Sequence, residues 1–137
     1  MSTSQTFLAI GAIFLFSITS LNVNRMNVKS VNSSVDNQIT NDAVNFGRDM
    51  SDMVQSFAFR YDDLMNQIGG LNDVTSSSHR MTRTTDFGYT LHAVFDISNE
   101  ETLQHGQTGR LVAIRIFHEE HGNFIEKAEY VTSVVPL

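Results

Sequence analysis

The residues best suited to chemistry in this chain are its five histidines, because an imidazole binds metal ions and transfers protons near neutral pH. His79, His92, His105 and His118 follow one another at intervals of thirteen residues, and His121 comes three residues later. The residues around each histidine differ, so this interval predicts no structural repeat. The sequence His-Glu-Glu-His at 118–121 lacks the spacing that places two histidines on one face of a helix. We expect it to lie at a solvated turn.

Paired carboxylates are the second candidates for chemistry. Asp62 and Asp63 are adjacent, as are Glu119 and Glu120, and adjacent side chains face each other on neither a helix nor a strand. The chain contains no cysteine, which excludes disulfides, thiolate nucleophiles and Cys-ligated zinc or iron–sulfur sites. It also contains no Gly-rich phosphate loop and no Gly-x-Ser-x-Gly sequence. We therefore expect no enzyme, with no catalytic, metal-binding or cofactor-binding residues and no cofactor.

Charge is distributed unevenly along the 137 residues. Nine basic and fifteen acidic residues give a net charge of −6, which argues against a nucleic-acid partner because phosphate binding needs a basic face. The first 35 residues contain Arg25, Lys29 and no acidic residue, so the remainder carries a net charge of −8. The length suits one domain with a modest hydrophobic core.

Residues 7–21 form the most apolar segment, and a helix built from them is apolar on every side. Such a helix must be surrounded by lipid or protein. At about 1.5 Å per residue it spans about 22 Å, short of the ~30 Å hydrocarbon core, although flanking residues extend it. A cleaved signal peptide would need basic residues before the segment and a small-x-small site after it, and the sequence has neither. A buried core helix is the third alternative, but so small a domain rarely surrounds a helix.

The position of the basic residues bears on membrane orientation. Arg25 and Lys29 follow the apolar segment, and the positive-inside rule then places the C-terminal part in the cytoplasm if Met1 is the initiator. If Met1 is instead a processed N-terminus, exposed by removal of a charged leader, the orientation is reversed. Both alternatives stay open at this point.

An apolar stripe at helical spacing follows this segment and runs for about eleven turns. It predicts a helix over 40–68, capped by Thr40, Asn41 or Asp42 if the helix begins there, and stopped by Gly69 and Gly70. Residues 22–37 are rich in Asn, Ser and Val, which lower helix propensity. The alternatives are one helix of about sixty residues with a weak middle or two helices with an extended joint. The first half must pack on something outside this chain.

The C-terminal part predicts antiparallel strands. Residues 86–98 alternate between a mostly polar face and an apolar face. The apolar face comprises Phe87, Tyr89, Leu91, Ala93, Phe95 and Ile97; the polar face comprises Gly88, Thr90, His92, Val94, Asp96 and Ser98. Two further strands, 110–118 and 124–135, are joined as a hairpin through 119–123. We interpret 99–109 as a polar loop and 74–85 as a loop or a weak edge strand.

These elements predict an α+β fold, in which a long N-terminal helix packs against a small C-terminal antiparallel sheet of three or four strands. The first part of the helix is apolar and the second part is amphipathic. Residues 1–39 comprise the apolar helix and the Asn/Ser-rich joint, in a filament core or a membrane. Residues 40–137 comprise a globular head, with helix 40–68 and an antiparallel sheet within 86–135. The stripe from Ala43 to Ile68 is the expected cover of the sheet.

This order of elements resembles that of the type IV pilins and pseudopilins. In that family a leader peptidase cuts before a residue that is often Phe or Met, which Met1 would fit. The fifth mature position is usually Glu, which is thought to pair with the N-terminal amine of a neighbour. Here it is Gln5, whose amide can accept a hydrogen bond from an ammonium group without neutralising it. The chain also has Asn22 near the place of a helix-kinking Pro, no Phe-Thr-Leu-Ile-Glu-type opening and no C-terminal disulfide loop.

The resemblance implies a structural subunit of a helical extracellular filament at the cell surface, with a membrane-inserted precursor pool. The implied partners are other copies of the chain, the inner membrane before assembly and the filament assembly machinery, with no nucleic acid. The expected assembly interface comprises Gln5, Phe7, Ile10, Ile13, Phe14, Phe16, Ile18 and Leu21. The alternative is a single-pass membrane-anchored protein with a small extracytoplasmic domain that binds a partner.

Overall fold

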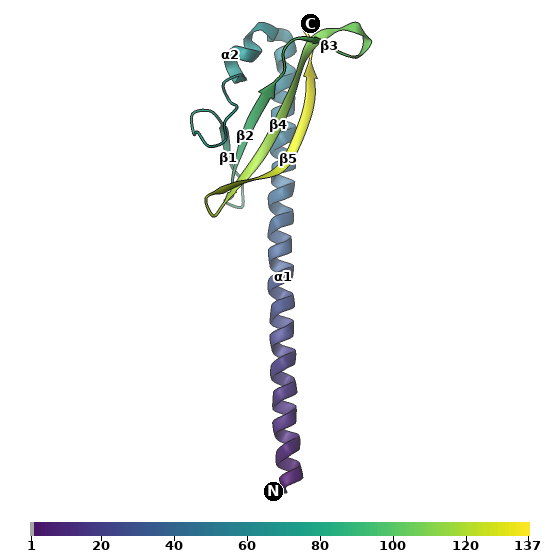
Figure 1. The fold of residues 1–137 in the computed structure, drawn as a ribbon, viewed down its shortest axis with the longest axis vertical. Helices are drawn as coiled ribbons and strands as arrows, with labels where there is room; N and C mark the ends of the chain where they lie inside the picture. Colours follow the sequence, from purple (N-terminus) through teal and green to yellow (C-terminus); the bar gives the residue numbers. More distant parts are fainter. Residues whose placement is uncertain (1) are drawn as a thin grey trace. The chain divides into compact units, whose positions relative to one another are not determined.

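The computed structural model describes residues 2–137, which fall into two compact units (Figure 1). The first unit ends at Asn37, and the second comprises Gln38–Leu137. The predicted α+β class is confirmed, with one long N-terminal helix and a small antiparallel sheet. The alternatives for Met1, initiator or processed N-terminus, concern a residue outside the described part of the chain.

Helix α1 comprises Thr3–Ser56. It continues through the segment rich in Asn and Ser, so one continuous helix is the alternative that holds, and no helix begins at Thr40. The predicted C-terminal end at Ile68 is confirmed, but the regular α-helix is interrupted before it. A 3-10 helix η1, Phe57–Asp63, follows α1, and a short helix α2 comprises Leu64–Ile68.

The interruption of the predicted helix begins at Ser56, whose hydroxyl donates to the Met53 carbonyl at 2.5 Å. A serine hydroxyl bonded in this way competes with the backbone ladder. Arg60 then leaves the helical region entirely, with φ −137° and ψ 50°. The change of direction still lets Phe57, Leu64 and Ile68 bury their side chains.

The sheet has five strands, where three or four were predicted: β1 (Met81–Thr84), β2 (Thr90–Ile97), β3 (Glu101–Thr102), β4 (Thr108–Glu120) and β5 (Asn123–Val134). All pairs are antiparallel: β1 pairs with β2, and β2, β3 and β5 each pair with β4. Strand β1 is the edge strand that was one alternative for 74–85. Strand β3 lies in the segment that we expected to be a loop, because a strand of two residues has no detectable periodicity.

The predicted hairpin between 110–118 and 124–135 is confirmed as β4 and β5. Its turn consists of His121 and Gly122, whose φ angles are 52° and 79°. Two successive positive φ angles are typical of a type I′ turn, whose twist matches that of the flanking strands. The pairing of β4 with β5 is in register from Arg110 to Ile116 and shifts by one residue beyond it.

The core of the second unit lies between α1 and one face of the sheet. Every third or fourth residue of α1 is buried there: Ile39, Ala43, Phe46, Met50 and Val54. Opposite them the sheet buries Leu91, Ala93, Phe95, Val112, Ile114, Ile116 and Val134. The helical stripe therefore covers the sheet as predicted.

Strand β2 differs from its prediction in two ways. His92 and Val94, expected on a polar face, are each only 3% exposed. Thr82 and the ring of Phe124 pack against the His92 ring on that face. Phe87, expected on the apolar face, is 66% exposed. It lies in the turn before β2, where the Gly88 N–H donates to the Thr85 carbonyl, so the alternation in the sequence extends beyond the strand.

Candidate assembly surface

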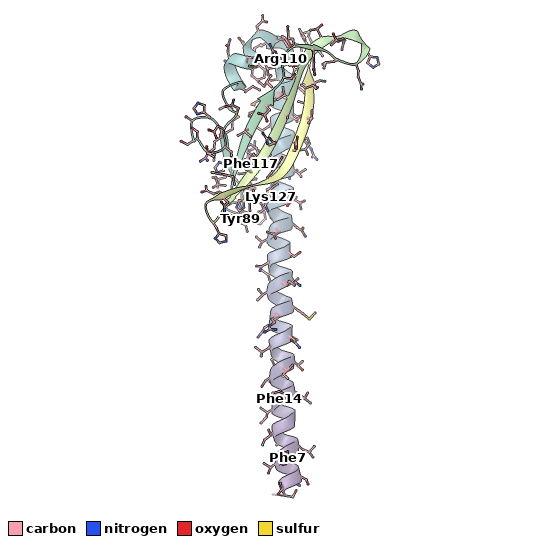
Figure 2. All side chains as sticks on the ribbon, viewed as in Figure 1. Phe7, Phe14, Tyr89, Arg110, Phe117 and Lys127 are labelled. Carbon is pink, nitrogen blue, oxygen red and sulfur yellow. The ribbon has the colours of Figure 1, made fainter. Side chains whose placement is uncertain are left out.

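The candidate functional surface is the side-chain surface of α1 within the first unit. The apolar residues predicted at the assembly interface are all exposed: Phe7, Ile10, Ile13, Phe14, Phe16, Ile18 and Leu21. Phe7 and Phe16 are each 74% exposed, although phenylalanine is normally among the most buried residues. Figure 2 shows Phe7 and Phe14 among the side chains that project from this part of the helix. Exposed apolar surface on this scale marks a contact with lipid or protein.

These side chains do not form a single stripe. At 100° per residue, Phe7, Phe14 and Leu21 lie on one side of the helix, whereas Ile13 and Phe16 lie on the other. The structure therefore distributes the predicted interface around the whole circumference. A surface of this kind is covered by lipid or by several neighbouring helices, since one partner helix covers only one side.

The polar side chains within the apolar segment are satisfied by the helix itself. Ser17 Oγ donates to the Ile13 carbonyl and Thr19 Oγ1 donates to the Leu15 carbonyl, each at 2.9 Å. A hydroxyl bonded to the carbonyl four residues earlier needs no water. Because the helical backbone also satisfies its own groups, this segment can enter an apolar environment without an unsatisfied donor at these positions.

In the structure, the uncharged part of α1 is longer at both ends than the apolar segment 7–21. The chain is helical from Thr3, and Arg25 is its first charged residue, so residues 3–24 give an uncharged length of about 33 Å. That length matches the ~30 Å hydrocarbon core better than the 7–21 segment alone. By length and composition the helix is long and apolar enough to cross a membrane, a test that signal sequences and buried helices of soluble proteins also pass.

Gln5 has a role at the start of α1 that the sequence reasoning missed. Its Oε1 accepts from the Ser2 N–H and its own N–H donates to Ser2 Oγ, each at 3.3 Å. This reciprocal pair is a capping box, which satisfies two backbone donors at the helix N-terminus. The spacing Ser-x-x-Gln at 2–5 is its sequence signal. The amide oxygen of Gln5 is therefore engaged within its own chain.

The charged residues of the first unit form a separate feature of the surface. Arg25, Lys29 and Asp36 are exposed, and no ion pair within residues 2–137 involves them. A shallow groove on the helix is lined by Leu21, Asn24, Arg25, Val28, Lys29 and Asn32. Apolar and basic side chains thus share one side of the helix directly after the uncharged segment.

The residues singled out for chemistry are dispersed over the second unit. His79 contacts the Ser76 and Ser78 hydroxyls, and His118 Nδ1 lies 3.1 Å from Glu120 Oε1. Of the 118–121 segment, only His121 is in the turn, while 118–120 belong to β4. Within residues 2–137, no three His, Cys, Asp or Glu side chains are close enough to hold a metal ion. Asp62 and Asp63 lie in η1.

Two of these groups have shifted pKa values. The hydrogen bond from His118 and the nearby charge of Lys127, whose Nζ is 3.4 Å from Glu120 Oε1, lower the pKa of Glu120. Burial and the positive charge of Arg80 lower the pKa of His92. Both shifts are explained by packing and pairing around β2 and β4.

The hollow closest to these histidines is polar and open. It is lined by Arg80, Thr82, Gly88, Tyr89, Thr90, His92, His118, Glu119, His121 and Gly122. The guanidinium of Arg80 lies 5.4 Å from the centre of the Phe124 ring and donates to the Val74 carbonyl at 2.7 Å. The Arg80 guanidinium therefore packs against the fold at this hollow.

No family model, curated protein or solved structure matches this chain. The resemblance to the type IV pilins therefore stays a prediction based on the order of the elements and on the residues quoted for it.

Proposed function

We propose that this chain is a structural subunit of a helical extracellular filament of the type IV pilus kind, which assembles through the first part of α1. The observation that carries the proposal is the exposure of apolar side chains on every side of the helix between Phe7 and Leu21. The buried stripe of α1 begins only at Ile39. The cover for the first part of the helix must therefore come from outside the chain.

The energetics favour a bundle of several helices. Full burial of one Phe, Ile or Leu side chain contributes about 2 kcal/mol, so the seven apolar side chains of the predicted interface contribute on the order of 10 kcal/mol. This free energy is comparable with the cost of the translational and rotational freedom that a subunit loses on association. Because the side chains surround the helix, one neighbour cannot bury them all. Head-to-tail contacts that do not close into a ring continue as a filament.

The same segment suits a membrane-inserted precursor before assembly. Its uncharged length matches the hydrocarbon core, and its hydroxyl groups are bonded within the helix. The partners are then other copies of the chain, the inner membrane and the assembly machinery. After assembly the acidic remainder, with its net charge of −8, faces solvent at the cell surface and repels neighbouring filaments.

The decisive experiment replaces Phe14 in the cells that produce the protein. Phe14→Asp places a carboxylate among the packed helices, and we expect electron microscopy to show no filaments. Phe14→Leu, the matched control, keeps the position apolar and should leave filaments unchanged. Circular dichroism of the purified chain should show the same strand content and melting temperature for both variants, because Phe14 lies outside the second unit. Normal filaments from Phe14→Asp would contradict the proposal.

The alternative function is a single-pass membrane-anchored protein whose second unit binds a partner. An anchored monomer stays in the membrane fraction and forms no ordered fibres, so fractionation combined with electron microscopy distinguishes the two functions. Mass analysis of the N-terminus of native material adds an independent measurement. A methylated Met1 without further leader supports the filament subunit, whereas an unmodified initiator contradicts a processed pilin-like N-terminus.

A further inference from the structure

Three charged residues of the first unit lie where their own helix cannot pair them. A helical side chain reaches residues three or four positions away. For Arg25 and Lys29 those positions hold Asn, Leu, Val, Met, Ser and each other, and for Asp36 they hold Asn, Ser, Ile and Thr. Consistently, none of the three takes part in an ion pair within residues 2–137. Opposite charges on this unit can meet only between copies of the chain.

The three charges share one side of the helix with apolar residues. At 100° per residue, Arg25, Lys29 and Asp36 fall within about 40° of one another. The groove between Leu21 and Val28 is bordered by Arg25 and Lys29. A neighbouring helix that covers this groove also takes the basic side chains out of water. A basic group covered without a counter-charge or a hydrogen-bond acceptor is strongly unfavourable, so the neighbour must supply such partners.

A spacing of seven residues recurs along this part of α1. It separates successive members of an apolar row, Phe7, Phe14, Leu21, Val28 and Val35. It also separates Lys29 from Asp36 and Arg25 from Asn32. Seven residues are nearly two helical turns, about 10.5 Å along the axis, and they return to almost the same side of the helix.

We propose that neighbouring copies pack the first part of α1 in parallel with an offset of seven residues, so that Lys29 of one copy lies opposite Asp36 of the next. This inference rests on the proposed filament. The same offset places Arg25 opposite Asn32, whose amide oxygen accepts from the guanidinium group. It also places Phe7 opposite Phe14 and Phe14 opposite Leu21, so the apolar row stays continuous across the contact.

Other arrangements fail on charge or on burial. With no offset, Arg25 meets Arg25 and Lys29 meets Lys29. An offset of four residues places Lys29 opposite Arg25. An offset of eleven pairs Arg25 with Asp36 but breaks the apolar row twice, with Phe14 opposite Arg25 and Leu21 opposite Asn32. The offset of seven also sets Ile18 opposite Arg25, but Ile18 lies outside that row. An antiparallel contact between Lys29 and Asp36 leaves the two apolar segments at opposite ends and uncovered. Only the parallel offset of seven pairs opposite charges and also keeps the apolar row together.

Disulfide trapping tests the offset directly, because the chain has no cysteine of its own. Cells that naturally make the protein would produce two full-length variants together, Val28→Cys and Val35→Cys, which keep all three charges. A disulfide needs Cα atoms within about 7 Å. We expect oxidation to link the two variants into a mixed dimer. Either variant produced alone should give little dimer. Val28→Cys produced together with Asn32→Cys should also give little dimer. Preferential linkage in any of these controls would overturn the offset.

Charge reversal tests the ion pair. Lys29→Glu should reduce filament yield several-fold, because it sets like charges at every contact. Lys29→Glu combined with Asp36→Lys restores opposite charges and should restore the yield. If Lys29 instead binds anionic lipid headgroups, Lys29→Glu lowers the amount of membrane-inserted precursor and the double variant does not recover, which would overturn the inference.

These outcomes separate the two proposals. Wild-type cells without filaments would contradict the proposed function, while a mixed Val28→Cys and Val35→Cys dimer in the membrane fraction would still support the offset. Filaments that form normally but link at another offset would contradict only the offset.

Discussion

Gly47 of α1 faces the ring of Tyr130 of β5 so closely that a Cβ atom built on Gly47 would lie 2.6 Å from Tyr130 Cδ2. Ile116 Cγ1 would lie 3.5 Å from the same atom. A glycine inside a helix costs up to about 1 kcal/mol relative to alanine. Its presence here is explained by the approach of the helix to the sheet, which leaves no room for a side chain.

The first prediction concerns Gly47→Ala. Overpacking against the Tyr130 ring costs about 2 kcal/mol and the gain in helix propensity returns about 1 kcal/mol. We expect the free energy of unfolding of the second unit, measured by urea denaturation, to fall by about 1 kcal/mol. Gly11→Ala is the matched control, because nothing lies within 4 Å of a Cβ there. A variant Gly47→Ala as stable as the wild type would contradict the close approach.

The second prediction concerns Arg83 of β1, which contacts two side chains of α1. Its Nη1 donates to Asp49 Oδ2 at 2.6 Å, and its Cζ lies 4.5 Å from the centre of the Phe46 ring. The ion pair is about half exposed, so Asp49→Asn should reduce the free energy of unfolding by only about 0.5 kcal/mol. Arg83→Ala also removes the cation–π contact and should cost about 1 kcal/mol more.

Urea denaturation in low and high salt checks this order. The effect of Asp49→Asn should diminish at high salt, because salt screens an exposed ion pair. The contact of Arg83 with Phe46 persists, so most of the effect of Arg83→Ala should remain. Equal losses for the two variants would show that the contact of Arg83 with the Phe46 ring adds no stability.

Helical periodicity predicted the core of the second unit because burial repeats along a helix. The stripe at Ile39, Ala43, Phe46, Met50 and Val54 is buried as expected. The end of α1 could not be predicted in the same way. Apolar residues continue at helical spacing beyond Ser56, so the pattern carries no signal of the non-helical backbone at Arg60.

The sheet shows a similar division. Strands β4 and β5 are long, and the turn residue Gly122 marks the boundary between them, so both were predicted to within a few residues. Strands β1 and β3 are too short to carry a pattern. Alternation also places His92 correctly on the face opposite Leu91, but it cannot tell whether neighbouring strands and loops bury that face.

The candidate assembly surface was easier to predict than the end of α1 or the short strands. An apolar side chain such as Phe14 needs cover in any environment, so composition alone marks residues 7–21. The capping box of Ser2 and Gln5 has a local sequence signal, Ser-x-x-Gln, but that signal does not show whether Gln5 bonds within its own chain or to a neighbour. What covers the segment depends on molecules outside the chain, and no local pattern encodes it.

The third prediction concerns the pH dependence of stability through His92. This side chain is only 3% exposed; its Nδ1 lies 3.0 Å from Thr82 Oγ1 and its ring is 5.7 Å from the Phe124 ring. Burial and the charge of Arg80 lower its pKa below the ordinary value of 6.5, with His118 acting in the same direction and Glu119 opposing them. The folded state therefore binds a proton less readily than the unfolded state.

Stability should therefore fall as pH decreases. Above pH 6.5 the imidazole is neutral in both states and contributes no pH dependence. Below that pH the unfolded chain gains a proton first, so the free energy of unfolding decreases until the lowered pKa of folded His92 is passed. His92→Gln removes this contribution. Urea denaturation between pH 7.5 and pH 5 should give a smaller loss for the variant, and parallel curves would rule out His92 as a source of the dependence.

The fourth prediction concerns the turn between β4 and β5, where a non-glycine residue occupies a position that favours glycine or asparagine. His121 has a φ angle of 52° and Gly122 has a φ angle of 79°. A side chain in the left-handed region costs about 1 kcal/mol, and asparagine tolerates it better than histidine. We expect His121→Asn to raise the free energy of unfolding by about 0.5 kcal/mol and Gly122→Ala to lower it by about 1 kcal/mol.

Thermal denaturation of both turn variants measures this pair of opposite shifts. The space around Gly122 is open to a Cβ atom, so steric contact cannot account for a loss in Gly122→Ala. The loss must come from the backbone conformation. Gly88, at φ 86° and also without a neighbour within 4 Å, provides a matched control in the β1–β2 turn, and Gly88→Ala should cost a similar amount. If His121→Asn destabilises the chain, the imidazole makes a contact at the turn that outweighs the backbone preference.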